Sequence, residues 1–299
     1  MQTLVSLSND LASAVERAAR AVVAVHARPR LPSTGVLWRP GIVVTAAHTV
    51  RVDEEIRVVW SDGRAAPATL VGRDLGTDLA VLRIDESDRP VAEIGDSAEL
   101  KVGNLVLAVG YGPRASWGVV SAVGGAWRTW GGGEVDRLLR VDLVLYPGFS
   151  GGPLVDASGK VAGLVTSGLS RQLELAVPTS TVTRVVDELL ATGRISRGYL
   201  GLGLQPVALP EALRSLAPGA DARGLIVVSV ETDGPAARAG LMLGDVLMAL
   251  EGTPLHDPDD VQAAVAGRRV GTAVTVSLLR AGAPLDLAVT LGERPSRRR

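Results

Sequence analysis

The 299-residue chain contains no cysteine and only three histidines, His26, His48 and His256. The absence of cysteine excludes disulfide bonds and thiolate metal ligands. Three histidines spread over the whole chain argue against a structural zinc site. A cysteine-free protein can work in an oxidising or a reducing compartment, so the redox environment stays open.

The sequence also lacks an excess of charge and a long apolar run. The formal net charge is −1, and the one basic cluster, Arg297–Arg299, is typical of a solvated tail. We therefore expect no nucleic-acid partner, and no run approaches the roughly 18 apolar residues of a membrane span. Charged residues between positions 9 and 20 interrupt any signal-peptide core. We expect a cytoplasmic protein if Met1 is the natural start. The alternative is an exported protein whose leader is absent from this sequence.

Aromatic residues are scarce, at 3%, whereas 35 glycines and 17 prolines punctuate the chain. Short Val, Leu and Ile runs between such turn residues are typical of an all-β core. We expect about a dozen strands in two series, within residues 34–84 and 105–177, without helical crossovers. Each series predicts one barrel or sandwich. The glycine-rich stretch Gly124–Gly133 is expected to be an exposed loop.

Helical spacing of apolar residues predicts helices at Ser8–Val25 and Thr181–Leu190, although Val22–His26 could equally begin a strand. The last hundred residues mix strands with two helices, Pro235–Ala239 and Asp257–Ala266. The expected divisions are an N-terminal helix and lead-in at 1–26, a double barrel with its C-terminal helix at 27–192, a linker at 193–198, a small α+β domain at 199–292 and a basic tail at 293–299.

Three short segments carry residues suited to covalent catalysis. In Gly148–Leu154, glycines flank Ser150 on a sharp turn before an apolar strand. A nucleophilic serine needs an exposed Oγ and small neighbours, so that the reacting carbonyl can approach the backbone. The N–H groups of Gly148 and Ser150 could then stabilise a tetrahedral oxyanion. An ordinary glycine-rich turn would account for this segment as well.

His48 and Asp78 each stand at one end of an apolar strand. Imidazole is suited to general-base catalysis near neutral pH, and the run Ile42–Ala47 leads directly to the histidine. The Asp78 carboxylate, just before Leu79–Leu82, would be satisfied by holding the other N–H of that imidazole. Taken singly, His48 also fits a structural histidine, and Asp78 a surface turn, a purpose that Asp74 would serve equally.

The conjunction of the three segments is more specific than any one of them. The order His48, Asp78, Ser150 is that of the chymotrypsin-type triad. The histidine and aspartate lie in the first strand-rich half and the serine in the second. A cleft between two barrels would therefore bring them together.

The segments Thr45–His48, Thr77–Leu82 and Ser150–Leu154 resemble the histidine, aspartate and serine motifs of trypsin-like serine proteases, most closely those of the bacterial HtrA/Deg family. The segment Gly95–Gly110 resembles the connection between that family's barrels. The resemblance spans residues 10–292. It implies a chymotrypsin-like double barrel followed by a PDZ domain, and endoproteolysis without a metal or a cofactor.

By the same resemblance, a substrate pocket would lie between Leu164–Gly168 and Leu173–Val177. The residues expected to line it, a mostly apolar set suited to an aliphatic side chain, are Leu164, Val165, Thr166, Ser167 and Leu175. Glu174 would favour a basic side chain if it pointed inward, whereas strand alternation favours a solvent-facing position. Phe149 stands where the family usually has Asn, and so bulky a ring could reshape the oxyanion turn.

The segments Gly234–Leu241 and Gly244–Leu247 resemble the PDZ domain of the same family. The loop before strand Leu202–Val207 would hold a peptide carboxylate through backbone N–H groups, and the strand would pair with the peptide. The residues expected to bind the peptide are Leu200, Gly201, Leu202, Val261 and Val265. A PDZ-like fold that only packs against the protease is the alternative.

The sequence thus predicts a serine endopeptidase that cleaves unfolded or C-terminally tagged proteins and binds peptide C-termini at its PDZ domain. One alternative is a proteolytically inactive peptide-binding or holdase protein, with Phe149 disabling the oxyanion hole. Another is an esterase with the same triad. Members of the family are commonly trimers joined by N-terminal aromatic residues. The first 37 residues here contain none, so a homo-oligomer would need other contacts.

Overall fold

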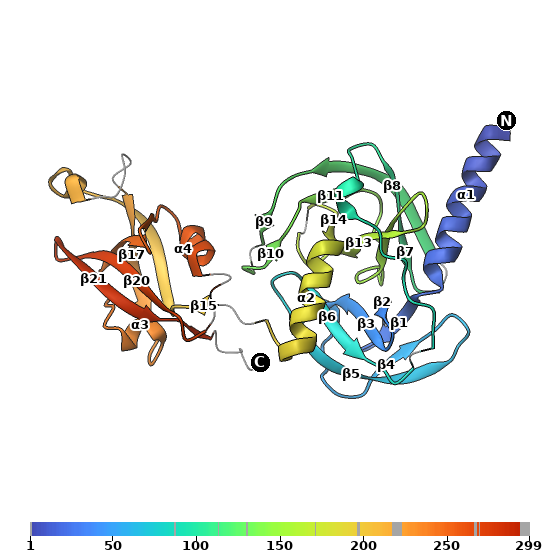
Figure 1. Ribbon diagram of the computed structural model, residues 1–299, viewed down its shortest axis with the longest axis horizontal. Coiled ribbons are helices and arrows are strands. Elements are labelled where there is room, and N and C mark those ends of the chain that lie inside the picture. Colours follow the sequence, from blue (N-terminus) through green and yellow to red (C-terminus); the bar gives the residue numbers. More distant parts are fainter. Residues whose placement is uncertain are drawn as a thin grey trace. The chain divides into compact units, whose positions relative to one another are not determined.

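The computed structural model describes residues 2–86, 88–112, 114–129, 131–170, 172–195, 198–216, 223–265, 268 and 270–293. The chain divides into two compact units, Met1–Ile195 and Ser196–Arg299 (Figure 1). The tail expected beyond Glu293, the linker residues 196–197 and the helix end expected at Ala266 lie outside the described residues. The two units are therefore described one at a time.

A closed antiparallel barrel forms the first half of unit 1, in the strand order β1-β2-β3-β6-β5-β4 (Figure 1). Its strands are β1 Val22–His26, β2 Ser33–Arg39, β3 Ile42–Ala46, β4 Ile56–Val59, β5 Ala65–Asp74 and β6 Leu79–Arg83. Inward-facing side chains such as Leu37, Val43 and Leu82 are fully buried and fill its core.

A second closed barrel follows, in the order β11-β14-β13-β12-β7-β8. Its strands are β7 Leu105–Gly110, β8 Arg114–Val123, β11 Leu139–Asp142, β12 Pro153–Asp156, β13 Val161–Thr166 and β14 Leu175–Pro178. Val106, Leu139 and Leu154 lie in its core. Together the two barrels confirm the predicted all-β, chymotrypsin-like double barrel.

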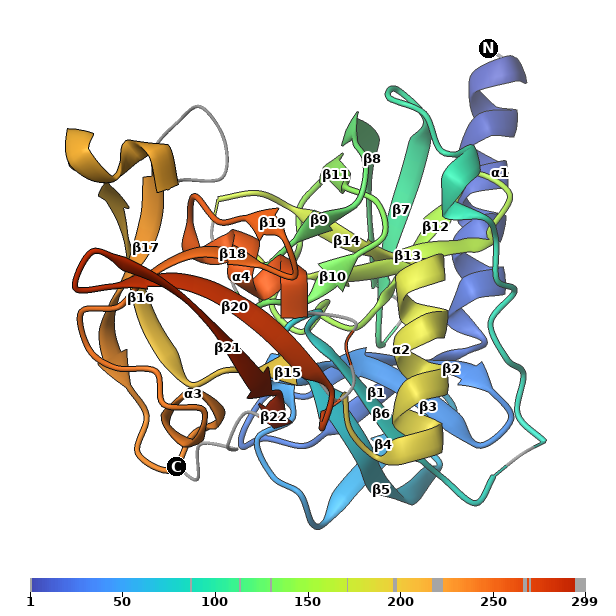
Figure 2. The ribbon, with the colours of Figure 1, turned by 60° about the vertical axis from the view of Figure 1, so that its left-hand side comes forward.

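A further core lies between the barrels and is completed by helices α1 Gln2–Ala19 and α2 Thr179–Thr192. Helix α2 packs against β5 and β6 of the first barrel and against β13 and β14 of the second (Figure 2). Its buried face carries Val182, Val185 and Leu189. Because one apolar helix face is shared by both barrels, burial of that face fixes the barrels relative to each other.

Two elements differ from the sequence expectation. Helix α1 spans Gln2–Ala19 rather than Ser8–Val25, and of the two alternatives left open for Val22–His26 the structure has the strand. The stretch Gly124–Gly133 is not simply an exposed loop, because it enters a hairpin of β9 Trp127–Arg128 and β10 Glu134–Val135. Thr129 is buried there and donates a 2.6 Å hydrogen bond to the carbonyl oxygen of Gly76. Glycines permit this close approach, which composition alone does not reveal.

Unit 2 is a small α+β domain, as predicted, built on a sheet in the order β16-β17-β18-β20-β21. Its elements are β15 Gly198–Tyr199, β16 Leu202–Ala208, β17 Arg223–Val230, α3 Pro235–Arg238, β18 Val246–Leu250, β19 Thr253–Pro254, α4 Pro258–Val265, β20 Ala273–Arg280, β21 Ala283–Thr290 and β22 Gly292–Glu293. Short 3-10 turns lie at η1 Ala47–Thr49 and η2 Ser97–Glu99 in unit 1 and at η3 Glu211–Leu216 in unit 2. Strand β16 is at one edge of the sheet and packs near α4.

Candidate active site at the junction of the two barrels

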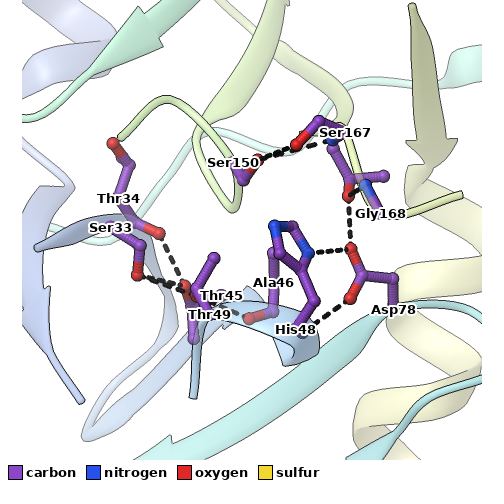
Figure 3. Close-up of polar contacts among 11 residues, drawn as sticks. Ser33, Thr34, Thr45, Ala46, His48, Thr49, Asp78, Ser150, Ser167 and Gly168 are labelled. Carbon is purple, nitrogen blue, oxygen red and sulfur yellow. Dashed lines mark hydrogen bonds and ion pairs between the residues drawn. The ribbon is translucent and has the colours of Figure 1, made fainter. Parts of the chain in front are cut away.

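The pairing of β3 with β6 brings His48 and Asp78 together. Ala46 lies opposite Leu79 in this antiparallel pair. His48 follows Ala46 by two residues, within turn η1, and Asp78 immediately precedes Leu79. The Nδ1 atom of His48 is 2.7 Å from Oδ2 of Asp78, and the backbone N–H of His48 donates to Oδ1 at 2.8 Å (Figure 3).

The Asp78 carboxylate is buried and its oxygens are well supplied with donors. Besides the two hydrogen bonds from His48, Oδ2 accepts a short hydrogen bond from the Thr166 hydroxyl. Thr166 in turn accepts a 2.9 Å hydrogen bond from the N–H of Gly168. The contact between Nδ1 and Oδ2 orients the imidazole, so that Nε2 is the ring nitrogen left for proton transfer.

Asp74 serves the turn before Asp78, the purpose that the sequence allowed for it. Its Oδ1 accepts from the N–H of Gly76 at 2.9 Å, and its Oδ2 accepts from the Thr77 hydroxyl at 2.7 Å. This turn leads the chain into Asp78, whose φ of 57° is in the left-handed region. Aspartate tolerates this region better than most residues do. Asp74 therefore stabilises the turn, and Asp78 contacts His48.

Ser150 lies in a turn of the second barrel that is tied to the first barrel by Thr34 of β2. The Thr34 hydroxyl donates to the carbonyl oxygen of Gly148 at 2.7 Å, and the Thr34 N–H donates to that of Ser150 at 3.3 Å. An ideal Cβ on Gly151, where φ is 86°, would lie 2.5 Å from Oγ1 of Thr45. Only glycine fits this contact between the barrels. Thr34 was not predicted as part of the site, because its partners in the serine turn are more than a hundred residues away in the chain.

The Ser150 turn presents backbone N–H groups that are free to bind a ligand. Gly148 has φ of 93°, and its carbonyl oxygen is turned to Thr34. Phe149 donates its N–H to the carbonyl oxygen of Tyr146 at 3.0 Å. Among the described residues, none accepts a hydrogen bond from the N–H of Gly148 or of Ser150. Both groups are thus available to an oxyanion, as an oxyanion hole requires.

The Phe149 ring packs into the second barrel. It is fully buried, and an ideal Cβ on Gly110 would lie only 2.6 Å from its Cε1 atom. Tyr146 meets the ring edge-on at 5.5 Å between centroids, and the Arg114 guanidinium lies 5.5 Å from its centroid. Gly110 has no side chain, and the Phe149 ring fills the space that this leaves.

The Ser150 hydroxyl lies 3.1 Å from the hydroxyl of Ser167, and the Ser167 N–H donates to it at 3.4 Å (Figure 3). Between His48 and Ser150, both of which the structure describes, no hydrogen bond is formed in this conformation. The imidazole lies between the Ser150 turn and Asp78 (Figure 3). The predicted residues are therefore gathered at one place, with the serine turned toward Ser167.

The expected pocket residues differ in exposure. Leu164 and Val165 are buried in hydrophobic cores, and Leu175 is buried as well. Thr166 is buried against Asp78, whereas Ser167 is exposed beside Ser150. Glu174 is half-buried, and burial raises the pKa of its carboxyl.

In unit 2 the expected peptide-binding residues surround the start of the edge strand β16. Leu200 is buried in the domain core, Gly201 has φ of 79°, and Leu202 is half-buried at the first position of β16. Val261 and Val265 of α4 are 6% exposed and belong to the same core. Among the described strands β16 pairs with β17 along one side only, so its other side is available for pairing with an added strand.

Two further properties of the described residues concern ligands and membranes. No cluster of three or more metal-binding side chains is found in the described part of the chain. Across the same residues, no helix has the length and apolar character needed to cross a membrane.

Comparison with known proteins defines the class of both units. Residues 33–164 match a trypsin-like peptidase domain, and residues 198–291 match a PDZ domain. A probable periplasmic DegP-like serine endoprotease from Brucella suis is 37% identical over 283 residues, which cover 91% of this chain and 54% of the relative. The chain thus spans about half the length of the curated relatives it matches.

Solved structures match over nearly the whole length of both chains. The HtrA-type protease AlgW with a decapeptide has a TM-score of 0.76 at 31% identity, covering 96% of this chain and 99% of that one. The serine endoprotease from Yersinia pestis has a TM-score of 0.76 at 32% identity, covering 95% and 98%. This chain belongs to the HtrA family of trypsin-like serine endoproteases with a PDZ domain.

The relatives' names correct the expected compartment. They describe periplasmic proteins, so the prediction of a cytoplasmic protein is wrong. The charged residues between positions 9 and 20 describe only that stretch of the sequence and do not establish a compartment.

Proposed function

We propose that this chain is a serine endopeptidase in which His48, Asp78 and Ser150 form the catalytic triad. The single observation that carries the proposal is the hydrogen-bonded His48–Asp78 pair beside a serine turn with free N–H groups. A buried, hydrogen-bonded carboxylate that orients an imidazole, next to a serine hydroxyl, is the arrangement needed for acyl transfer.

In the proposed mechanism, Nε2 of His48 takes the proton of the Ser150 hydroxyl as its Oγ attacks the carbonyl carbon of a peptide bond. The N–H groups of Gly148 and Ser150 stabilise the negative oxygen of the tetrahedral intermediate. His48 then gives the proton to the leaving amine, and the C–N bond breaks to leave an ester on Ser150. Water then attacks the ester carbonyl as His48 takes its proton, and the C–O bond to Ser150 breaks, releasing the acid while His48 returns the proton to the Ser150 oxygen.

A fluorophosphonate probe tests the nucleophile. The folded wild-type protein is expected to be labelled at Ser150, as located by peptide mapping, whereas Ser150→Ala and heat-unfolded protein remain unlabelled. Digestion of a peptide library by wild type and by Ser150→Ala then gives the preference for the residue before the cleaved bond. Folded wild-type protein that resists the probe would instead support the non-hydrolytic peptide-binding or holdase alternative.

The position of Phe149 favours the enzyme over this alternative. Its ring is fully buried beside Gly110 and takes no part in the surface of the turn. The neighbouring N–H groups that would bind an oxyanion stay free, as described above. An esterase with the same residues is tested by comparing peptide and ester substrates of the same sequence.

We also propose that unit 2 binds peptide C-termini and so delivers unfolded or C-terminally tagged proteins to the protease. The AlgW structure, which is named with a decapeptide, supports peptide binding within the family. In our chain the proposed site is the Leu200–Leu202 loop with β16 and α4. Fluorescence anisotropy on full-length Ser150→Ala protein is expected to show binding of a peptide with a free C-terminal carboxylate. Equal binding of its C-terminal amide would contradict the carboxylate role.

The proposed place of action is outside the cytoplasm, as for the periplasmic relatives. A homo-oligomer joined through contacts other than N-terminal aromatic residues remains our proposal for assembly. Size-exclusion chromatography with light scattering measures the oligomeric state, and a monomer at micromolar concentration would contradict it.

A further inference from the structure

Residues 166–168 form a short segment in which each residue touches a different part of the proposed catalytic machinery. Thr166 donates its hydroxyl to Asp78. An ideal Cβ on Gly168 would lie against the same carboxylate and 2.6 Å from Nδ1 of His48. Between them, Ser167 makes two contacts to the Ser150 hydroxyl, at 3.1 Å from its own hydroxyl and 3.4 Å from its N–H.

The neighbours of Ser167 hold it in place. Thr166 is buried at the end of β13, and Gly168 is bonded to the Thr166 hydroxyl through its N–H. Ser167 itself is exposed, so its hydroxyl is free of other packing constraints. The hydrogen bonds of Thr166 and Gly168 hold the backbone on both sides of Ser167, so less conformational entropy is lost when its hydroxyl bonds to Ser150.

We infer that Ser167 holds the Ser150 hydroxyl in a resting position, from which it must turn toward His48 before it can attack. The inference rests on the proposed function of Ser150. In the resting position Ser150 accepts the N–H of Ser167 and shares a hydrogen bond with its hydroxyl, and it makes none to the imidazole. Ser167 is thus a positioning residue that lowers the intrinsic reactivity of the nucleophile.

This role predicts a gain of reactivity when the hydroxyl is removed. In Ser167→Ala only the longer backbone contact to Ser150 remains, so the attacking position becomes more populated. The expected increase is about three- to tenfold, the factor that corresponds to one neutral hydrogen bond. Ser167→Thr retains a hydroxyl and is expected to stay close to wild type. Structural damage, in contrast, would lower the rate.

The test is the second-order rate constant for inactivation by diisopropyl fluorophosphate, a small electrophile without a peptide side chain. It reports on Ser150 independently of contacts in the substrate pocket. Ser180→Ala, an exposed serine of α2, is the matched control. The expected result is faster inactivation of Ser167→Ala alone, with an unchanged midpoint of the rate's pH profile.

A Ser167→Ala rate equal to or below the wild-type rate overturns the inference while leaving the proposed function intact. A change confined to KM for peptides, with the same inactivation rate, also overturns it, since a simple pocket-lining residue would behave in that way. If folded wild-type protein does not react at all, the result contradicts the proposed function and therefore also the inference about Ser167.

Discussion

The packing of Phe149 against Gly110 makes a sharp prediction about the oxyanion turn. An alanine at position 110 would place its Cβ 2.6 Å and 2.7 Å from two carbons of the Phe149 ring. Both distances are well inside van der Waals contact, so the ring has to move. The ring is fully buried, with Tyr146 at its edge and Arg114 over it, so little space is available. The displacement is therefore transmitted to the backbone between Gly148 and Ser150.

The expected losses in unfolding free energy and in kcat come from two separate effects. Overpacking a well-filled core costs about 1–3 kcal/mol of unfolding free energy. Loss of one well-placed oxyanion donor lowers kcat by about 10²–10³-fold. We therefore expect Gly110→Ala to remain folded but to lose up to this factor in kcat, with a smaller change in KM. Peptide hydrolysis gives kcat and KM, and urea unfolding gives the free energy.

A second substitution tests the physical cause. Phe149→Leu shortens the side chain, so Gly110→Ala should cost much less in that background than in wild type. The double-mutant cycle then shows a coupling between the two positions. Gly125→Ala is the matched control, since nothing lies within 4 Å of an ideal Cβ there. If Gly110→Ala keeps the kcat of the Gly125→Ala control, the packing argument is refuted.

Other predictions concern the His48–Asp78 pair and the core of unit 2. Gly168→Ala would push a methyl group against the Asp78 carboxylate and the imidazole, so kcat should fall by at least tenfold while stability changes by less than about 2 kcal/mol, measured by hydrolysis and urea unfolding. Asp78→Asn should lower kcat by about 10⁴-fold, as in the chymotrypsin-type triad; a loss under tenfold would contradict its role. In unit 2, hydrogen bonds from Arg280 hold the pKa of Asp245 below its usual value. Because folding lowers this pKa, the ion pair stabilises the folded unit above the pKa of an unfolded aspartate, about 3.9. The stabilisation is lost as the pH falls through the lower pKa of the folded state. Asp245→Asn should cost about 1–3 kcal/mol at neutral pH, seen as faster amide exchange in β17, β18 and β20; unchanged exchange would show that the pair is dispensable.

The sequence by itself determined the double barrel, the PDZ-like unit and the three residues proposed as the triad. Turn residues between short apolar runs define strands locally, and the motifs around His48, Asp78 and Ser150 are local in sequence. The antiparallel register of β3 and β6, in which Ala46 lies opposite Leu79, then places His48 beside Asp78. The glycine-rich stretch at 124–133 was misjudged, because composition does not show that Thr129 would bond to Gly76.

Only the tertiary structure decided how the two halves of the site are joined and how the nucleophile is held. Thr34 ties the serine turn to the first barrel, and Ser167 contacts the Ser150 hydroxyl. The space that accepts the Phe149 ring is provided by Gly110, on another strand. These contacts link residues that are distant in the chain or have no motif of their own. Their geometry depends on the packing of whole barrels, and no local pattern encodes it.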